Sequence, residues 1–395
     1  MRMTERTKTR RIVLLSNSFD EQYDSVRGEE IPPTLAIEKR RRLLQCLELA
    51  TGCPIIVLSS PPKASKRRLP RWLPPVETRF DNYPQFICAN WDIPKLRVPL
   101  SWLFYALHVV RHTRDDDIIL IDNYEILYVI AVWAVRFRRR VRFVLDYEDG
   151  RHLIDKGVYF VMSRQAEVLG RPLLTAALVA APALQKRLPP QLPVELVPGF
   201  YVPLSDSNRS HPSNNGLRFL YSGSLDKTRG VDLLLAAVEL LPPSGWQLHI
   251  TGAGELEEQV RKSAQNSTQR VLFHGKLPAK RYEQLLCECH VGLNCQRTSD
   301  PISEVTFPSK IFSYLGSGLV VLSSRASSVP SICAEACFYY DEETPSNLAR
   351  AMRQLMEDFP NLQEKAKQRA AIMDKYSLAG TSSRLRSLFR RAKLA

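Results

Sequence analysis

The N-terminal half of the chain alternates between short apolar runs and segments with helical spacing of leucine. Compact runs of Ile, Val and Leu are typical of strands that are buried on both faces of a parallel sheet. Such runs lie at 11–16, 54–60, 117–123, 139–149 and 176–182. Segments with the pattern of helices lie between them, at 34–51, 100–113 and 126–137. The pattern predicts a doubly wound α/β domain.

Two stretches interrupt this alternation. Residues 61–84 are rich in Pro, Lys and Arg and predict a loop, and 84–91 predicts a short strand at its end. Residues 201–216 contain mainly Ser, Asn and Pro, which indicates a hinge. We therefore expect an N-terminal domain at 1–200 and a linker at 201–216.

The alternation resumes after the linker. Strands are predicted within LRFLYSGSL, WQLHITGAG, RVLFHG, VGLNC and LVVLSS, and helices within GVDLLLAAVELLP, ELEEQVRKSAQ, AKRYEQLLCEC and PSKIFSYLGSG. We expect a second domain at 217–375 and a basic C-terminal helix at 376–395. The predicted fold class is α/β, with two Rossmann-like doubly wound domains. Because ligands bind beyond the carboxyl ends of parallel strands, we expect both domains to face one cleft.

The net charge of +14 and the pI of about 9.5 indicate an anionic partner, either a membrane surface, a phosphorylated substrate or a nucleic acid. Nucleic acid is disfavoured, because the basic residues are not interleaved with aromatic residues in a recognisable module. The chain has no run of about 20 apolar residues, so no membrane span is expected. The basic segments favour peripheral contact with anionic lipid at the inner membrane face.

The eight cysteines do not predict a metal centre. Cys287, Cys289, His290 and Cys295 lack the paired spacing of zinc sites and are expected in the core. Cys333 and Cys337 are expected to pack on one face of a helix. The chain shows no secretory signal, which favours reduced thiols and a cytoplasmic protein.

The segment YSGSLDKTRG, 221–230, has the composition of a phosphate-binding turn. Gly223 allows a ligand to approach the backbone closely. Lys227 and Arg229 supply positive charge before the next helix, whose first N–H groups are free to bind an anion. A turn with solvated charges is the alternative.

The segment ITGAGELEEQV, 250–260, is a second glycine turn. Gly252 and Gly254 match part of a dinucleotide fingerprint, but the third glycine is absent, so a nicotinamide dehydrogenase is the least favoured function. Glu255 could bind the hydroxyl pair of a ribose, or could simply lie favourably at a helix N-terminus.

The segment FPSKIFSYLGSG, 307–318, predicts an anion site at the start of a helix. Pro308 suits the first helical position. The N–H groups of Ser309 and Lys310 and the charge of Lys310 would then bind a phosphate, with a solvated lysine as the alternative. Glu304 lies just upstream and could contact the neutral part of the same ligand.

Taken together, these segments resemble the GT-B glycosyltransferases of the family-4 retaining type. The resemblance covers about 215–345, through FLYSGSLDKTRGVDLLLAAVELL, LHITGAGELEEQV, VLFHGKLPAKRYEQLLCECHVGLNC and FPSKIFSYLGSGLVVLSS. It implies transfer of a hexosyl group from a nucleotide-diphosphate sugar to a hydroxyl acceptor with retention. It implies no cofactor other than this donor and no metal.

The resemblance also assigns roles to residues. Arg229, Lys310 and Ser309, with Lys227 as a weaker candidate, would bind the diphosphate. Gly275, Lys276 and Leu277 would line the base, and Glu304 would orient the sugar. On the acceptor side, Glu148 and Asp149 in FVLDYEDG take the place of the polar residue that the family carries there.

The chain departs from the family at several positions. Ser224 stands where the family usually has Arg beside the diphosphate. Val305 and Ser313 stand where it has a pair of glutamates. SNSFDEQYDSVRGEE, 16–30, replaces the N-terminal glycine-rich loop. These differences leave two alternatives open, a catalytically inactive nucleotide-sugar-binding partner subunit and a nucleotide-sugar epimerase of the same fold. The sequence does not identify the sugar or the base of the donor. It also does not identify the acceptor, which could be lipid-linked or a polysaccharide.

Overall fold

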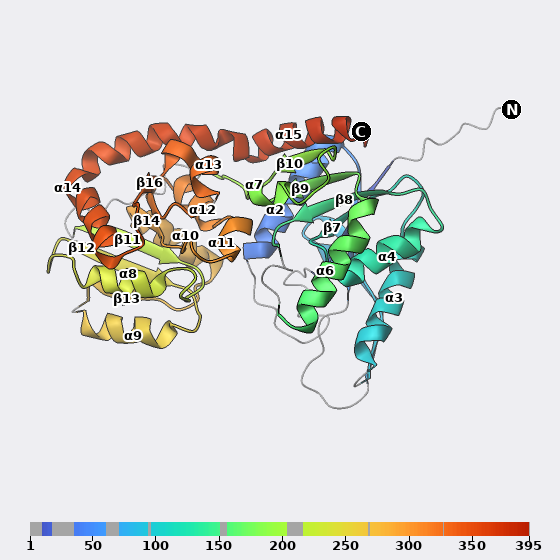
Figure 1. The fold of residues 1–395 in the computed structure, drawn as a ribbon, viewed down its shortest axis with the longest axis horizontal. Coiled ribbons are helices and arrows are strands. Elements are labelled where there is room, and N and C mark those ends of the chain that lie inside the picture. Colours follow the sequence, from blue (N-terminus) through green and yellow to red (C-terminus); the bar gives the residue numbers. More distant parts are fainter. Residues whose placement is uncertain are drawn as a thin grey trace. The chain divides into compact units, whose positions relative to one another are not determined.

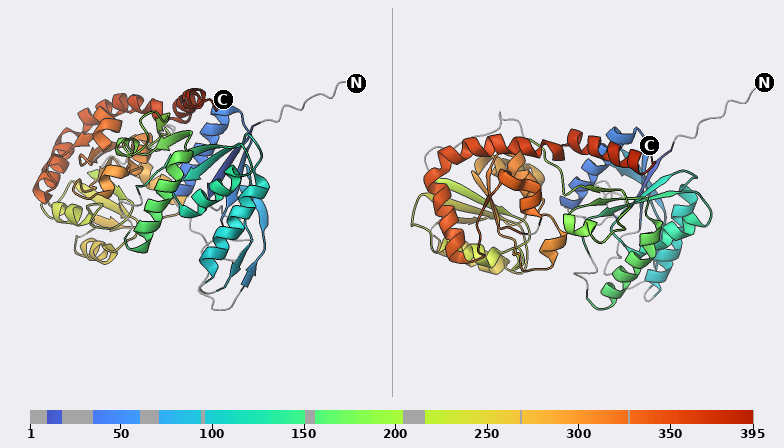
Figure 2. Two further views of the ribbon diagram at one scale, coloured as in Figure 1. Left: turned by 45° about the vertical axis from the view of Figure 1, so that its right-hand side comes forward. Right: turned by 45° about the horizontal axis from the view of Figure 1, so that its top comes forward.

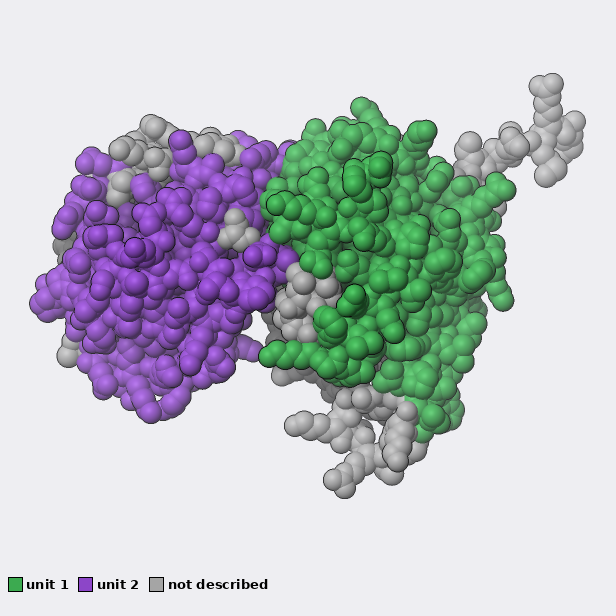
Figure 3. All heavy atoms as spheres, in the orientation of Figure 1, with its two compact units in different colours: residues 1–197, 381–395 green, residues 198–380 purple. Residues whose placement is uncertain are grey.

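The computed structural model describes residues 10–17, 35–60, 71–93, 96–150, 156–203, 216–267, 269–326 and 328–394 (Figure 1). The chain forms two compact units (Figure 3). Unit 1 comprises residues 1–197 and 381–395, and unit 2 comprises residues 198–380. Most of the predicted hinge, 204–215, and most of the segment that replaces the glycine-rich loop, 18–30, lie outside the described residues.

The sheet of unit 1 has the strand order β10-β9-β8-β7-β1-β2-β5-β4 and is parallel except for the β4–β5 pair. Its strands are β1 (Ile12–Ser16), β2 (Ile55–Ser59), β4 (Val76–Phe80), β5 (Tyr83–Ile87), β7 (Ile118–Asp122), β8 (Arg142–Tyr147), β9 (Ala176–Val179) and β10 (Val194–Leu196). The central strands β1 and β2 are buried along their whole length, which explains their continuous apolar runs.

The prediction of a loop at 61–84 is wrong for its second half. Residues 61–70 lie outside the described part of the chain, but β3 (Arg71–Leu73) pairs with β6 (Asn90–Asp92), and β4 forms the sheet edge. In β4, exposed and half-buried residues alternate before buried Phe80. An edge strand tolerates such charged residues, and this made its composition similar to that of a loop.

The helices of unit 1 are α2 (Leu35–Thr51), α3 (Arg97–His112), α4 (Ile126–Arg136), α6 (Val158–Gly170), the 3-10 helix η1 (Arg171–Leu173) and α7 (Pro182–Gln185). Helices α3, α4 and α6 each precede a strand that steps in the same direction across the sheet. Right-handed crossovers therefore place them on one face, where Figures 1 and 2 show them side by side, and place α2 on the other.

The C-terminal helix α15 (Leu378–Arg391) contributes its residues from Thr381 onward to unit 1. Its Arg384 donates a hydrogen bond of 2.7 Å to the carboxylate of Glu195 in β10. Arg386 donates to the backbone carbonyls of Leu49 and Ala50 at the end of α2. These contacts hold the end of the chain against unit 1.

Unit 2 contains a parallel six-stranded sheet of order β13-β12-β11-β14-β15-β16. Its strands are β11 (Leu217–Ser222), β12 (Trp246–Thr251), β13 (Val271–Phe273), β14 (Val291–Asn294), β15 (Val320–Ser323) and β16 (Phe338–Tyr339). Its helices are α8 (Val231–Val238), α9 (Glu257–Asn266), α10 (Ala279–Glu288), α11 (Ile302–Val305), α12 (Lys310–Gly316), α13 (Val329–Cys333) and α14 (Pro345–Ala370), with 3-10 helices η3 (Ala334–Ala336) and η4 (Ala371–Tyr376). The prediction of two Rossmann-like doubly wound domains is confirmed.

Two local predictions in unit 2 need correction. Helix α12 begins at Lys310 with Ser309 as its N-cap, so Pro308 precedes the cap and is not the first helical residue. Cys333 ends α13, whereas Cys337 follows η3, so the two cysteines do not share a helix face, although both are buried.

The strand order of unit 2 reverses between β11 and β14. Strands β12 and β13 lie on one side of β11, and β14 and β15 lie on the other. The chain segments that follow β11 and β14 therefore turn to opposite faces of the sheet, and the carboxyl end where they part is where sheets of this kind usually have a ligand crevice.

Gly230 holds the loop after β11 against the loop after β14. It precedes α8 in a left-handed conformation, with φ of +69°. A Cβ at this position would lie 1.9 Å from the backbone oxygen of Cys295. Only glycine fits this approach between the two loops.

We expect Gly230→Ala to destabilise unit 2 by more than about 3 kcal/mol, because backbone strain of about 1–2 kcal/mol adds to a clash with rigid backbone. Gly275→Ala is the matched control, since Gly275 has φ of +61° and open space at its Cβ position. The control should lose only the strain energy. Thermal unfolding of both variants measures the difference, and equal losses would contradict the role given to Gly230.

Candidate functional site

The loop after β11 is shaped by Asp226. Its carboxylate accepts hydrogen bonds from the Thr228 hydroxyl at 2.7 Å and from the Arg229 N–H at 2.8 Å. Leu225 is completely buried, and its N–H donates to the carbonyl of Ala253. The loop is therefore a fixed turn, and the backbone at Arg229 has one defined orientation.

The side chain of Arg229 is oriented by Gln296, which follows β14. Arg229 Nη1 donates a hydrogen bond of 2.5 Å to Gln296 Oε1. Gln296 is completely buried, and its Nε2 donates to the hydroxyl of Ser303 at 2.8 Å. A buried amide with both ends bonded has little freedom, so it fixes the guanidinium at the carboxyl end of β11 and β14.

Lys310 lies in the same crevice and is 9% exposed. Its Nζ lies 4.0 Å from the centre of the Tyr221 ring, and Tyr221 belongs to β11. Burial, together with the nearby positive charge of Arg229, lowers the pKa of Lys310 to about 7. The opposing influence of Cys295 and Asp226 is weaker. The ammonium group is thus held where its charge is poorly solvated.

Neither cation has a carboxylate partner. Within the described part of the chain, no ion pair involves Arg229 or Lys310. Buried cations in proteins are normally paired. Lys310 and half-buried Arg229 thus lie near each other at the switch point of a parallel sheet, and the Asp226 carboxylate offsets their charge only in part.

The glycines of the site fall into two kinds. A Cβ at Gly252 would lie 1.8 Å from the oxygen of Gly223, and one at Gly254 would lie 2.4 Å from the oxygen of Leu225. These two glycines let the loop after β12 pack against the loop after β11. At Gly223, with φ of +131°, and at Gly275 a Cβ would meet nothing, so these two positions leave room beside the backbone.

The other residues predicted on this side are more exposed. The side chains of Ser224, Lys227, Glu255 and Lys276 are exposed, and Ser309 and Leu277 are half-buried. Gly275 accepts hydrogen bonds from Gly252 N–H and the Thr251 hydroxyl, so the loop at 275–277 adjoins the loop after β12. Glu304 lies on α11 with an exposed side chain.

Hydroxyl groups surround Ser313, one of the two positions where the family has a glutamate. The Ser222 hydroxyl lies 3.0 Å from the hydroxyls of both Tyr282 and Tyr314, and Tyr282 also bonds to Ser313. The other position, Val305, is 2% exposed. The pair of carboxylates is therefore replaced by a neutral hydroxyl cluster and a buried apolar side chain.

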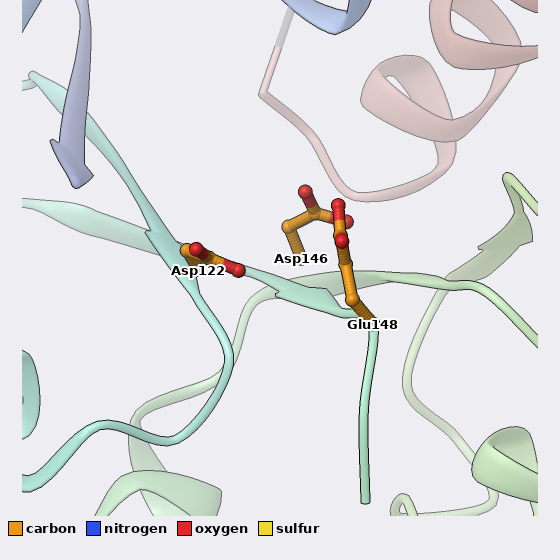
Figure 4. A group of neighbouring side chains, drawn as sticks. All are labelled: Asp122, Asp146 and Glu148. Carbon is orange, nitrogen blue, oxygen red and sulfur yellow. The ribbon is translucent and has the colours of Figure 1, made fainter. Parts of the chain in front are cut away.

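In unit 1, three carboxyl groups gather at the ends of β7 and β8. They belong to Asp122, Asp146 and Glu148, and their ligand atoms lie within 4.8 Å of one another (Figure 4). Arg40 of α2 pairs with Asp122 at 2.6 Å, and Lys39 pairs with Glu148 at 3.2 Å. Sequence analysis assigned a role to Glu148 but not to the other members of this cluster.

Burial and neighbouring charges shift the pKa values of these carboxyl groups in different directions. Burial and the Glu148 carboxylate raise the pKa of Asp146 well above its ordinary value. Burial also favours the neutral form of Glu148, but Lys39 and Arg40 outweigh it and lower the pKa of Glu148.

Asn123 positions the two predicted acceptor residues. Its φ is +55°, and its Oδ1 accepts hydrogen bonds of 2.9 Å from the N–H groups of both Glu148 and Asp149. Both side chains are half-buried. The loop after β8 is therefore tied to the end of β7.

Comparison with known proteins decides the class of unit 2. The family model described as "Glycosyl transferases group 1" matches residues 216–358. This segment is a group 1 glycosyltransferase domain. Its match includes the loop with Arg229, the crevice with Lys310 and the base-side loop at 275–277, so the resemblance inferred from the sequence is confirmed. Comparison with curated protein sequences gave no significant match.

Solved structures resemble the whole chain. HepE of Anabaena, in complex with UDP, has a TM-score of 0.68 at 15% identity, over 96% of this chain and 99% of that one. Sucrose-phosphate synthase of Thermosynechococcus elongatus has a TM-score of 0.66 at 14% identity, over 96% and 98%. The lipopolysaccharide outer core galactosyltransferase WaaB has a TM-score of 0.63 at 13% identity, over 97% and 99%. At these identities the likeness shows the fold, which is GT-B.

Sequence reasoning missed the residues that orient the cations and the acceptor loop. Asn123 is the last residue of one predicted strand and Gln296 directly follows another, and a polar residue at such a place is a usable signal. Lys39 and Arg40 lie in the basic run EKRRR of a predicted helix, where nothing in the sequence separates them from solvated neighbours.

We expect Gln296→Ala to raise the KM of the glycosyltransferase domain for its donor roughly tenfold, because a hydrogen bond to a charged group contributes about 1.5 kcal/mol or more. Gln296→Glu, which has nearly the same shape, should weaken donor binding further by neutralising Arg229. Steady-state kinetics measures both variants, with thermal unfolding as the control for folding. An unchanged KM in both would show that Gln296 does not position Arg229.

Donor binding should also weaken above pH 7. Below its pKa of about 7, Lys310 is already charged; above it, the lysine must take up a proton to face a diphosphate. The dissociation constant should therefore rise by up to about tenfold per pH unit above pH 7. Titration calorimetry with UDP-glucose measures this slope. Lys310→Arg, whose charge does not titrate, should flatten it, and an equal slope in both proteins would contradict the assignment.

Proposed function

We propose that the protein transfers a hexosyl group from a nucleotide-diphosphate sugar to a hydroxyl acceptor, with retention at the anomeric carbon. The observation that carries the proposal is that Arg229 and Lys310 lie near each other at the carboxyl end of β11 and β14 and, among the described residues, form no ion pair. HepE was solved with UDP and with UDP-glucose, which makes uridine donors the first to test.

The proposed chemistry places both cations on the diphosphate. When the bond between the sugar and the diphosphate breaks, negative charge grows on the leaving oxygen. Fixed cations in a site of low dielectric stabilise that charge more than they stabilise the ground state. Lys310 and Arg229 supply this charge, Ser309 supplies its N–H, and protein cations do the work that a metal does elsewhere.

We infer the remaining donor contacts from the glycines at which a Cβ would meet no other atom. The open positions at Gly223 and Gly275 let the diphosphate and the base approach the backbone. The base would lie along Gly275, Lys276 and Leu277, and Glu304 would orient the sugar. With Val305 and Ser313 in place of glutamates, the cations carry more of the binding energy than they would beside two carboxylates.

On the acceptor side we propose that Glu148 and Asp149 orient the hydroxyl that attacks. Their backbone is fixed by Asn123, and Glu148 remains ionised beside Lys39, so it can accept a hydrogen bond from a hydroxyl. A lipid-linked or polysaccharide acceptor on a cytoplasmic, peripherally bound enzyme fits the basic character of the chain.

A second function has one observation in its favour. Val305 is buried and Ser313 is bonded to Tyr282, so neither can act as a carboxylate toward the donor. A catalytically inactive nucleotide-sugar-binding partner would show this loss. It would bind a nucleoside diphosphate in calorimetry and release no sugar from any donor with any acceptor.

A screen of nucleoside diphosphates and their sugars by thermal shift tests the proposed function first. The matching donor is then incubated with and without acceptor, and NMR of the product reads the anomeric configuration. A product formed only with acceptor, with the configuration of the donor, supports transfer with retention. An altered nucleotide sugar formed without acceptor supports epimerisation, and an inverted product contradicts retention.

Lys310→Ala should lower turnover at least tenfold, which corresponds to about 1.4 kcal/mol of transition-state stabilisation. Folding should be preserved, because removing a poorly solvated charge does not leave a partner unpaired. Lys280→Ala is the control, since Lys280 is an exposed lysine of the same unit with no role in the proposed site, and its effect should be much smaller. Unchanged kinetics of Lys310→Ala would remove Lys310 from the mechanism.

A further inference from the structure

Helices α3 and α6 of unit 1 expose apolar side chains on their outer sides. In α3, Tyr105 and Val109 are completely buried, whereas Leu103 and Leu107 on the other side are 56% and 55% exposed. In α6, only Ala166 and Gly170 are buried, and several apolar residues along its length are exposed. The outer side of a helix that faces only water is normally polar.

Helix α4 lies between these two helices and continues the same surface (Figure 2). Its Trp133 donates a hydrogen bond of 3.1 Å to the carbonyl of Leu169 in α6. Phe137, directly after α4, is 83% exposed and lies 6.0 Å from the Trp133 ring. We use the name apolar face for six of the exposed apolar residues of α3 and α6 and of the residue after α4, namely Leu103, Leu107, Phe137, Val161, Val168 and Leu169.

Positive charge surrounds the exposed end of this face. Phe137 stands between Arg136 and Arg138, and Arg140 follows; these three arginines are exposed. Among the residues of α3, α4 and α6, Glu167 is the only acidic one. Asp115 and Asp116 are exposed in the adjoining turn, and Asp115 accepts a hydrogen bond from the Arg140 N–H.

Aromatic residues adjoin α3 on its other flank. The rings of Trp72 and Trp91, on the β3–β6 ribbon, lie 5.4 Å apart, and both side chains are more than two-fifths exposed. Trp72 also contacts Phe104 of α3 at 6.0 Å. Tryptophan is enriched where proteins meet the boundary between lipid and water, because its ring is apolar and its N–H is polar.

We propose that the apolar face docks unit 1 on an anionic membrane surface. Apolar side chains would enter the boundary between headgroups and acyl chains, and the arginines beside Phe137 would contact lipid phosphates. In the described part of the chain no helix is long and apolar enough to cross a bilayer, so the contact is interfacial. A second copy of the chain fits less well, because a symmetric interface would bring the same arginines together.

The inference gives the proposed function a partner and a surface. An enzyme held on the membrane meets a lipid-linked acceptor in the layer where that acceptor is confined. The docking itself depends only on unit 1, so it can be tested without a donor. Failure of docking would leave donor binding by unit 2 intact, and failure of donor binding would leave docking intact.

Vesicle flotation tests the proposal with the full chain. Vesicles of phosphatidylcholine alone are compared with vesicles that also contain phosphatidylglycerol. The double variant Leu107→Ser and Phe137→Ser should lower partitioning onto the anionic vesicles by about tenfold. Its control is Leu240→Ser, because Leu240 is a similarly exposed leucine of unit 2, and this variant should bind like the unchanged protein.

A second pair of variants tests the charge. Arg138→Glu with Arg140→Glu should lower partitioning by about tenfold or more at low salt. The control Lys262→Glu with Lys280→Glu changes the net charge equally but on unit 2, and it should have a much smaller effect. A thermal shift with UDP-glucose, measured on every variant, checks that unit 2 is unaffected.

Three outcomes would overturn the proposal. One is that the unchanged protein fails to float with anionic vesicles. Another is that the unit 1 variants bind as well as their controls. Alternatively, sedimentation would show a dimer that Leu107→Ser with Phe137→Ser dissociates, which would assign the face to a second copy of the chain.

Discussion

The structure of the donor site depends on one costly interaction, the burial of the Lys310 ammonium group against the ring of Tyr221 and near Arg229. A cation–π contact stabilises a desolvated ammonium by about 2 kcal/mol or more, but burial still disfavours the charged form. The lowered pKa of Lys310 reports this imbalance. In the proposed function, a diphosphate would supply negative charge to both cations and so offset part of this desolvation cost.

The rest of unit 2 keeps these two cations together. The reversal of strand order between β11 and β14 creates the crevice, and Gly230 lets the two loops at its rim touch. Asp226 fixes the backbone of Arg229, and Gln296 fixes its guanidinium. In this domain Ser224, Val305 and Ser313 replace charged residues of the family. Fewer charged side chains therefore remain at the site, and the hydrogen bonds to Asp226 and Gln296 fix the position of Arg229.

Much of the fold and part of the site could be predicted from the sequence, because they depend on residues that are close together in the chain. Alternating strands and helices follow from residue periodicity, and Lys310 follows two residues after Pro308 at a predicted helix start. Gln296 could not be assigned, because its contact with Arg229 joins residues 67 positions apart and exists only once β11 and β14 are neighbours. The same applies to Asn123 and to the pairing of Arg40 with Asp122.

Two elements of unit 1 were not predicted. Helix α6 was missed because apolar residues occupy its exposed side, which removes the amphipathic signal. Strand β4 was missed because edge strands carry charged residues.

The most direct test of the central claim is a crystal structure of the protein with UDP-glucose bound. The account predicts diphosphate oxygens within hydrogen-bond distance of both Lys310 Nζ and the Arg229 guanidinium, with Gln296 still bonded to that guanidinium. A diphosphate bound elsewhere in unit 2, with Lys310 still covered by Tyr221 and apart from the ligand, would contradict it.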